Sequence, residues 1–151
     1  GPYSYTGAVS TTSFFQAGTT ADVWLSTNTA TDTITFNAFS GGVQGVGGNF
    51  FGSDINGAFL AGSLTITATD ASGTVTQTLD ATSSSSFLGF VSNGAMTSLT
   101  VTSVQPVSGF LWPTVNNLTM GVAAAVPEPQ TFAMLLAGLG FVGFMARRRR
   151  G

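Results

Sequence analysis

The sequence contains no histidine, no cysteine and no lysine, and these absences exclude much of enzyme chemistry. They remove zinc sites of the His/Cys type, thiolate nucleophiles, Ser-His-Asp triads and Schiff-base lysines. Disulfides are excluded as well, so cysteine usage says nothing about the redox compartment. Charged residues are scarce too, at 7% of the 151 residues, against roughly 25% in an average soluble domain. We therefore expect a protein that is not an enzyme.

The few charges are divided unevenly along the chain. All the positive residues are consecutive, at Arg147, Arg148, Arg149 and Arg150, whereas residues 1–126 carry five aspartates and no cation. Such asymmetry between segments is typical of proteins that contact a membrane or a nucleic acid. We expect no nucleic-acid partner, because residues 1–126 have nothing with which to neutralise phosphates and their own charge repels them.

The C-terminal segment has the pattern of a membrane anchor. Two prolines within residues 126–130 disfavour a helix and predict an extended linker. Residues 131–146 follow without a charge and are apolar on every side, so a helix there has no polar face for a globular surface. Its length of about 24 Å falls short of a bilayer core of about 30 Å, but snorkelling arginines extend its reach. The positive-inside rule then places the arginines in the cytoplasm and the rest of the chain outside.

Pro127, Glu128 and Pro129, the short apolar helix and the arginine cluster together resemble the PEP-CTERM sorting signal of Gram-negative bacteria. The resemblance implies export with an N-terminal signal peptide, and the first residues, from Gly1, look like a trimmed start. It implies recognition of the tail by an exosortase, a membrane cysteine transpeptidase, with processing near the Pro-Glu-Pro sequence. It also implies a link to extracellular polysaccharide and biofilm. A plain single-span anchor is the alternative for this tail.

Residues 1–125 show the alternation of β-strands and no helical pattern. The clearest feature is a hairpin in which residues 63–70 and 74–80 alternate on either side of a turn. Further strands are expected at 10–16, 21–26, 31–39, 48–52, 87–92, 97–104 and 114–122. About eight short, evenly spaced strands predict an all-β fold, a jelly-roll-like β-sandwich. The expected core comprises Phe36, Phe50, Leu64, Ile66, Val75, Leu79, Phe87, Leu99, Val101 and Leu118.

Two tryptophans are candidate platforms for sugar binding. Trp24 is out of phase with Val23 and Leu25, on the face of the strand that also carries Asp22, and Trp112 lies beside a proline. Aromatic rings of this kind stack on sugars, although at sheet edges they more commonly complete the packing. The two residues therefore support a glycan-binding alternative without deciding for it.

The acidic residues suggest little chemistry. Asp54 and Asn56 resemble the start of a calcium loop, but no acidic run follows, so a turn is favoured and calcium remains the weak alternative. Two aspartates acting as acid and base on a glycoside are a remote alternative, because no histidine, lysine, arginine or glutamate is present in the domain to tune them. We expect no catalytic residue and no cofactor.

Four segments follow from these patterns. They are an extracytoplasmic β-sandwich (1–125), a linker with the sorting motif (126–130), a transmembrane helix (131–146) and a cytoplasmic arginine cluster (147–151). We expect a single-pass protein of the inner membrane that reaches the cell surface or the extracellular space after processing. The leading hypothesis for its function is a surface or matrix structural protein delivered through an exosortase. The rival hypothesis is a carbohydrate-binding module displayed at the cell surface.

Overall fold

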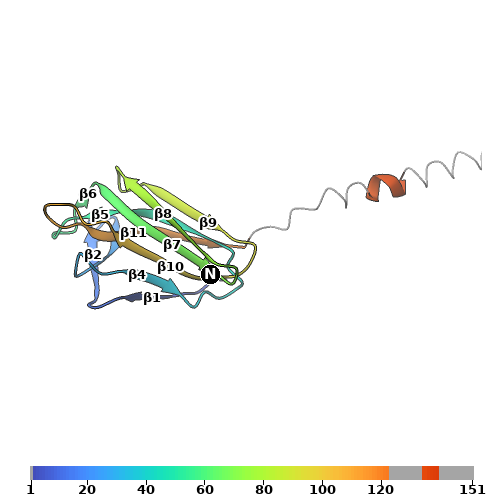
Figure 1. The fold of residues 1–151 in the computed structure, drawn as a ribbon, viewed down its shortest axis with the longest axis horizontal. Coiled ribbons are helices and arrows are strands. Elements are labelled where there is room, and N and C mark those ends of the chain that lie inside the picture. The colour runs from blue at the N-terminus through green and yellow to red at the C-terminus, as the bar shows by residue number, and fades with distance from the viewer. Residues whose placement is uncertain (1, 123–133, 140–151) are drawn as a thin grey trace, which may run out of the picture.

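The computed structural model describes residues 2–122 and 134–139, and the first of these ranges is built of β-strands (Figure 1). The strands are β1 (Thr6–Val9), β2 (Phe14–Gly18), β3 (Val23–Thr27), β4 (Ile34–Asn37), β5 (Gly45–Ser53), β6 (Phe59–Leu60), β7 (Gly62–Asp70), β8 (Thr74–Ala81), β9 (Phe87–Val91), β10 (Met96–Ser103) and β11 (Trp112–Gly121). Residues 134–139 are helical.

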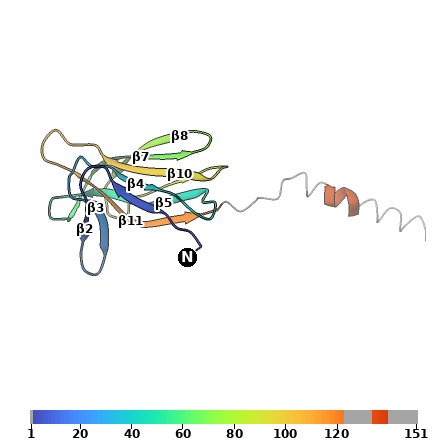
Figure 2. The same ribbon diagram turned by 90° about the horizontal axis from the view of Figure 1, so that it is seen from below.

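The strands form two antiparallel sheets that pack face to face, with β7, β8 and β10 in one layer and β2, β3 and β11 in the other (Figure 2). The five-stranded sheet has the order β1-β4-β10-β7-β8. The six-stranded sheet has the order β2-β3-β11-β5-β6, and β9 pairs with β5 as its sixth strand. The predicted all-β sandwich is confirmed.

The predicted hairpin is present as β7 and β8, with Thr69 opposite Thr74. Its turn is held by the Asp70 carboxylate, which accepts hydrogen bonds from the backbone N–H groups of Ser72 at 2.6 Å and Gly73 at 2.9 Å. Aspartate favours such turns because its short side chain reaches its own backbone two residues on. Along β7 the apolar residues face the core and the threonines face outward, as the alternation predicts.

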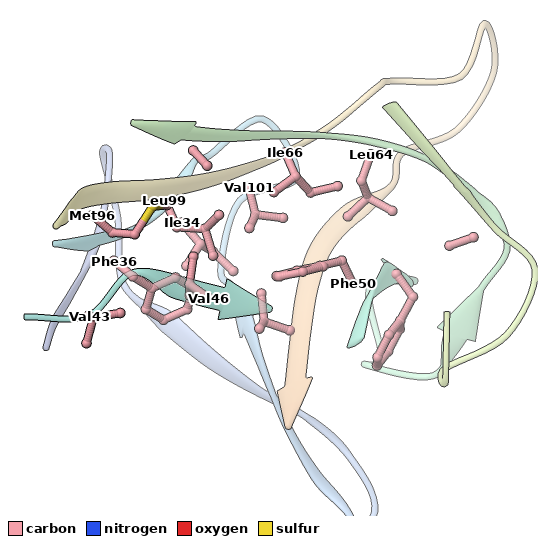
Figure 3. Close-up of a cluster of buried hydrophobic side chains, with 14 residues drawn as sticks. Ile34, Phe36, Val43, Val46, Phe50, Leu64, Ile66, Met96, Leu99 and Val101 are labelled. Atoms are coloured by element: carbon pink, nitrogen blue, oxygen red, sulfur yellow. The ribbon is translucent and has the colours of Figure 1, made fainter. Parts of the chain in front are cut away.

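The core lies between the sheets and contains most of the predicted residues (Figure 3). Side chains of the five-stranded sheet point toward Val46 and Phe50 of β5 in the opposite layer. Six predicted core residues are buried, namely Phe36, Phe50, Leu64, Ile66, Leu99 and Val101. Leu79 and Leu118 are partly buried and pack against this cluster.

Two predicted core residues are exposed, and each shows why alternation alone does not define a core. Val75 lies on the core-facing side of β8, opposite Ala68, yet it is 55% exposed because β8 is the edge strand of its sheet. Phe87 is 61% exposed because β9 turns Leu88 and Phe90 inward instead. Burial at these positions depends on what the opposite layer covers.

Two strands were not predicted. β1 and β6 are four and two residues long, too short for a period of two to stand out. The expected strand at 31–39 begins only at Ile34, because Asp32 belongs to the connection before it. The weak strand expected at 10–16 corresponds to β2, which begins only at Phe14. Residues 10–12 lie before it because they form hydrogen bonds with Asp32.

Candidate ligand-binding face and sorting tail

One row of side chains crosses the outer face of the six-stranded sheet. Phe87 of β9 pairs with Asn49 of β5, and Asn49 pairs with Asn116 of β11. Val115 pairs with Leu25, so Asn116 lies beside Trp24 of β3 in the antiparallel ladder. We call Trp24, Asn116, Asn49 and Phe87 the aromatic–amide row. It places an aromatic ring at each end and two amides between them, across strands far apart in the sequence.

Hydrogen bonds join the row to its neighbours on the same face. The Asp22 carboxylate accepts from Trp24 Nε1 at 2.8 Å and from Asn116 Nδ2 at 3.0 Å. Asn117 Nδ2 donates to Asn49 Oδ1 at 3.0 Å, and Asn49 Nδ2 donates to a backbone carbonyl at 3.0 Å. An asparagine side chain offers two donors and two acceptor lone pairs, so these amides keep capacity for further hydrogen bonds.

A β-bulge in β11 brings the second asparagine to this face. The pairing of β11 with β5 shifts between Asn116 and Thr119, and Asn117 has a φ of 51°. Asparagine tolerates this left-handed conformation better than most residues. Bulges often redirect side chains at functional sites, and here the bulge leaves Asn117 exposed beside the row.

Both rings of the row lie against glycine. A Cβ atom on Gly18 would stand 2.9 Å from the Trp24 ring, and one on Gly47 would stand 2.9 Å from Phe87 Cζ. Trp24 also packs edge-on against Phe51, with 4.9 Å between ring centroids. The absence of a side chain on each glycine lets the ring lie close to the backbone, which holds the ring in place.

Trp112, the second predicted sugar platform, lies away from the row. It packs edge-on against Phe110 at 6.1 Å, and both line a separate pocket of about 290 Å³ together with Ile55. The structure therefore does not combine the two tryptophans into one site.

Three buried hydroxyls separate the two tryptophans on this face. Thr114 Oγ1 donates to Ser53 Oγ at 2.9 Å and lies 3.1 Å from Ser26 Oγ, and all three residues are fully buried. The β5–β6 turn closes toward β2, where Gly18 N donates to the Gly57 carbonyl at 2.9 Å.

Sequence reasoning missed Phe87, Asn49, Asn116 and Asn117 as possible site members. The signal available was the Asn-Asn pair inside a predicted strand, where asparagine is normally depleted.

Asp54 and Asn56 form a turn. The Asp54 carboxylate accepts hydrogen bonds from the backbone N–H groups of Asn56 and Ala58, both at 2.9 Å. The Asp54 Oδ1 atom is thus occupied by the backbone of its own loop. Within residues 2–122 and 134–139, no group of three or more His, Cys, Asp or Glu side chains is placed to hold a metal ion.

Asp32 is a buried carboxylate with four donors. Its oxygens accept from Ser10 Oγ at 2.8 Å, from the Thr11 N–H at 3.1 Å and from the hydroxyls of Thr11 and Thr12. Burial raises the pKa of Asp32, but these hydrogen bonds outweigh it and hold the pKa below its ordinary value of 3.8. The carboxylate joins the connection after β1 to the connection before β4, so its role is structural.

Asp70 is similar in kind but only partly buried. The Ser92 hydroxyl donates to its carboxylate, and with the backbone donors of Ser72 and Gly73 this lowers the pKa of Asp70 below its ordinary value. The bond from Ser92 connects the β7–β8 turn to the end of β9, across the two sheets. This carboxylate, too, serves the fold.

The predicted sorting residues Pro127, Glu128 and Pro129 lie outside the described residues, as do Arg147 to Arg150. Of the apolar run at 131–146, the structure describes only residues 134–139. Their large side chains are exposed, with Leu135 at 59% and Met134 at 75%. Within the described ranges, no helix has the length and hydropathy that a membrane span requires.

Comparison with known families gives one match, over residues 125–150, to the PEP-CTERM protein-sorting motif. The chain carries a PEP-CTERM sorting tail. The match covers Pro127, Glu128 and Pro129 and the arginine cluster, which are the residues on which the resemblance rested. This PEP-CTERM tail marks a secreted protein that an exosortase processes. No curated protein and no solved structure matches the chain.

Proposed function

We propose that this chain is a structural protein of the cell surface or extracellular matrix, sorted through its PEP-CTERM tail and linked to extracellular polysaccharide or biofilm. The observation that carries the proposal is the motif match over residues 125–150. The exosortase acts near Pro127, Glu128 and Pro129, between the β-sandwich and the apolar run. The protein is held in the inner membrane before this step and leaves it afterwards.

The apolar run at 131–146 is proposed to span the membrane once. Residues 134–139 are helical and expose Met134, Leu135, Leu136 and Leu139, with exposed fractions from 59% to 75%. Large apolar side chains exposed together favour an apolar solvent. The arginines then hold the cytoplasmic end, since placing each one at the bilayer centre costs at least about 2.5–3.5 kcal/mol.

The β-sandwich is proposed to have a non-catalytic role, without a cofactor. Each described carboxylate accepts hydrogen bonds from nearby N–H or O–H groups, as at Asp32, Asp70 and Asp54, and Asp80 accepts from Ser63 Oγ at 2.6 Å. Most consecutive strands lie in opposite sheets, which supports a jelly-roll-like description. Uncharged threonines face outward on β7 and β8 and suit a surface exposed outside the cell.

The sorting proposal is tested by the mass of the mature protein from cells with and without the exosortase. We expect cleavage near residues 127–129, and therefore loss of the arginine cluster, only when the exosortase is present. Changing the four arginines to serine should release unprocessed protein or let the tail slip through the membrane. Changing them to lysine keeps the charge and should preserve retention. A mature protein that keeps Arg147 to Arg150 in both strains would refute the proposal.

A second candidate function, a carbohydrate-binding module displayed at the surface, is favoured by one observation. Trp24 stays partly exposed and donates to Asp22, which also binds Asn116. Aromatic rings beside carboxylate and amide groups are the usual means of binding sugars, because the ring packs on C–H groups and the polar groups bind hydroxyls. Binding of the purified chain to a panel of polysaccharides tests it.

A further inference from the structure

We propose that the aromatic–amide row, Trp24, Asn116, Asn49 and Phe87, is a binding site for a linear, uncharged polysaccharide. The inference rests on the second candidate function above and specifies its site and ligand. Two observations carry it independently, namely the order of these residues across four strands and the packing that holds the two rings in place.

The length of the row suits a chain-like ligand. Phe87, Asn49, Asn116 and Trp24 come from neighbouring strands, so the two rings are three strand spacings apart, about 14 Å. That distance corresponds to a few sugar units in an extended glycan. A ring at each end would cover the apolar face of a sugar, while the amides between them bind hydroxyl groups.

The row is organised before any ligand arrives. Gly18 underlies the Trp24 ring and Gly47 underlies the Phe87 ring, while the amides are held by Asp22 and Asn117. Holding binding groups in place reduces the entropy lost on binding. Phe87 is 61% exposed, so much of its ring is open to a ligand.

A shallow groove continues from the row toward the end of β11. It has a volume of about 440 Å³. Its lining combines four glycines with mostly apolar side chains, among them Gly47, Gly89, Phe87, Phe90, Val91 and Met120. Glycines in a strand interior weaken the strand and often mark a place where a ligand or another backbone approaches closely. The groove therefore offers the glycan a largely apolar path beyond Phe87.

Charge selects the class of glycan. Residues 2–122 contain five aspartates and no cation, and Asp22 lies beside the row. An acidic polysaccharide would meet net electrostatic repulsion there, with no cation to offset it. A neutral polysaccharide has no such repulsion to overcome, and its hydroxyl groups can donate to Asp22 and to the amide oxygens.

The test is calorimetric titration of the full 151-residue chain in mild detergent with neutral hexasaccharides of glucose, mannose and N-acetylglucosamine, and with an alginate hexasaccharide as the acidic probe. We expect binding of at least one neutral hexasaccharide and no binding of alginate. Phe87→Ala and Trp24→Ala should each weaken it about tenfold or more. Asn117→Ala should weaken it about threefold to tenfold.

Phe110→Ala is the matched control, because Phe110 is also 61% exposed but lies beside Trp112, away from the row. It should bind as the unchanged chain does, and each variant's melting temperature shows whether it is folded. Phe87→Ala and Asn117→Ala keep the test decisive if Trp24→Ala unfolds.

The possible failures are distinguishable. Binding that survives Phe87→Ala, Trp24→Ala and Asn117→Ala overturns the site but leaves the carbohydrate-binding function standing. Binding that is lost with Phe110→Ala or Trp112→Ala has the same consequence. Binding of alginate alone overturns the proposed ligand class. No binding to any glycan overturns the site and the carbohydrate-binding function together, without touching the sorting proposal.

Discussion

Replacing Asp32 by asparagine should destabilise the sandwich although it removes only one charge and almost no volume. Asp32 is 1% exposed and accepts from the hydroxyls of Ser10, Thr11 and Thr12 and from one backbone N–H. The asparagine amide has an NH2 group in place of one carboxylate oxygen. That group faces one of these hydrogen-bond donors and cannot accept from it. Leaving one shielded donor without its acceptor costs about 1–3 kcal/mol.

The expected loss can be measured by thermal unfolding of the full chain. At roughly 4 °C per kcal/mol for a domain of this size, the melting temperature should fall by about 4–12 °C. Asp80→Asn is the control, because Asp80 is exposed and accepts one side-chain hydrogen bond, from Ser63. Its cost should stay within about 0.5 kcal/mol.

The effect of pH gives a second check on the same carboxylate. The pKa of Asp32 is below its ordinary value of 3.8 in the folded protein, so the native state favours the ionised form. Its contribution is therefore complete well above pH 3.8 and is lost as the pH falls through the folded pKa. The difference between the unchanged chain and Asp32→Asn should shrink over that range. Equal melting of the two proteins at pH 7 would refute the role assigned to Asp32.

Four further substitutions, the last of them a control, test the core and its boundaries by thermal or denaturant unfolding. Phe50→Ala removes a fully buried ring and should cost about 3–5 kcal/mol; a cost below 1 kcal/mol would contradict the packing in Figure 3. Val75→Thr, at a residue 55% exposed, should change stability by no more than about 0.5 kcal/mol, whereas a core position would suffer more. Gly52→Ala places a Cβ 2.2 Å from Leu111 Cδ1 and should cost about 1–3 kcal/mol, while Gly94→Ala, with one atom at 4.0 Å, should be tolerated.

Local patterns in the chain were sufficient for most of the strands and for the tail. The β7–β8 hairpin follows from alternation and from an aspartate turn, both of which depend on neighbouring residues alone. The sorting tail is likewise contiguous, so its proline pair, apolar run and arginines are visible together in the sequence, and the family match covers the same stretch.

The binding row could not be found in this way, because its members come from four strands whose order differs from their order in the chain. Pairing of β9 with β5 and of β5 with β11 brings Phe87, Asn49 and Asn116 together, although dozens of residues separate them. The same non-local packing exposes Val75 at a sheet edge. Alternation states which residues share a side of a strand, whereas the opposite layer and the neighbouring strands determine which of those sides is covered and what lies beside it.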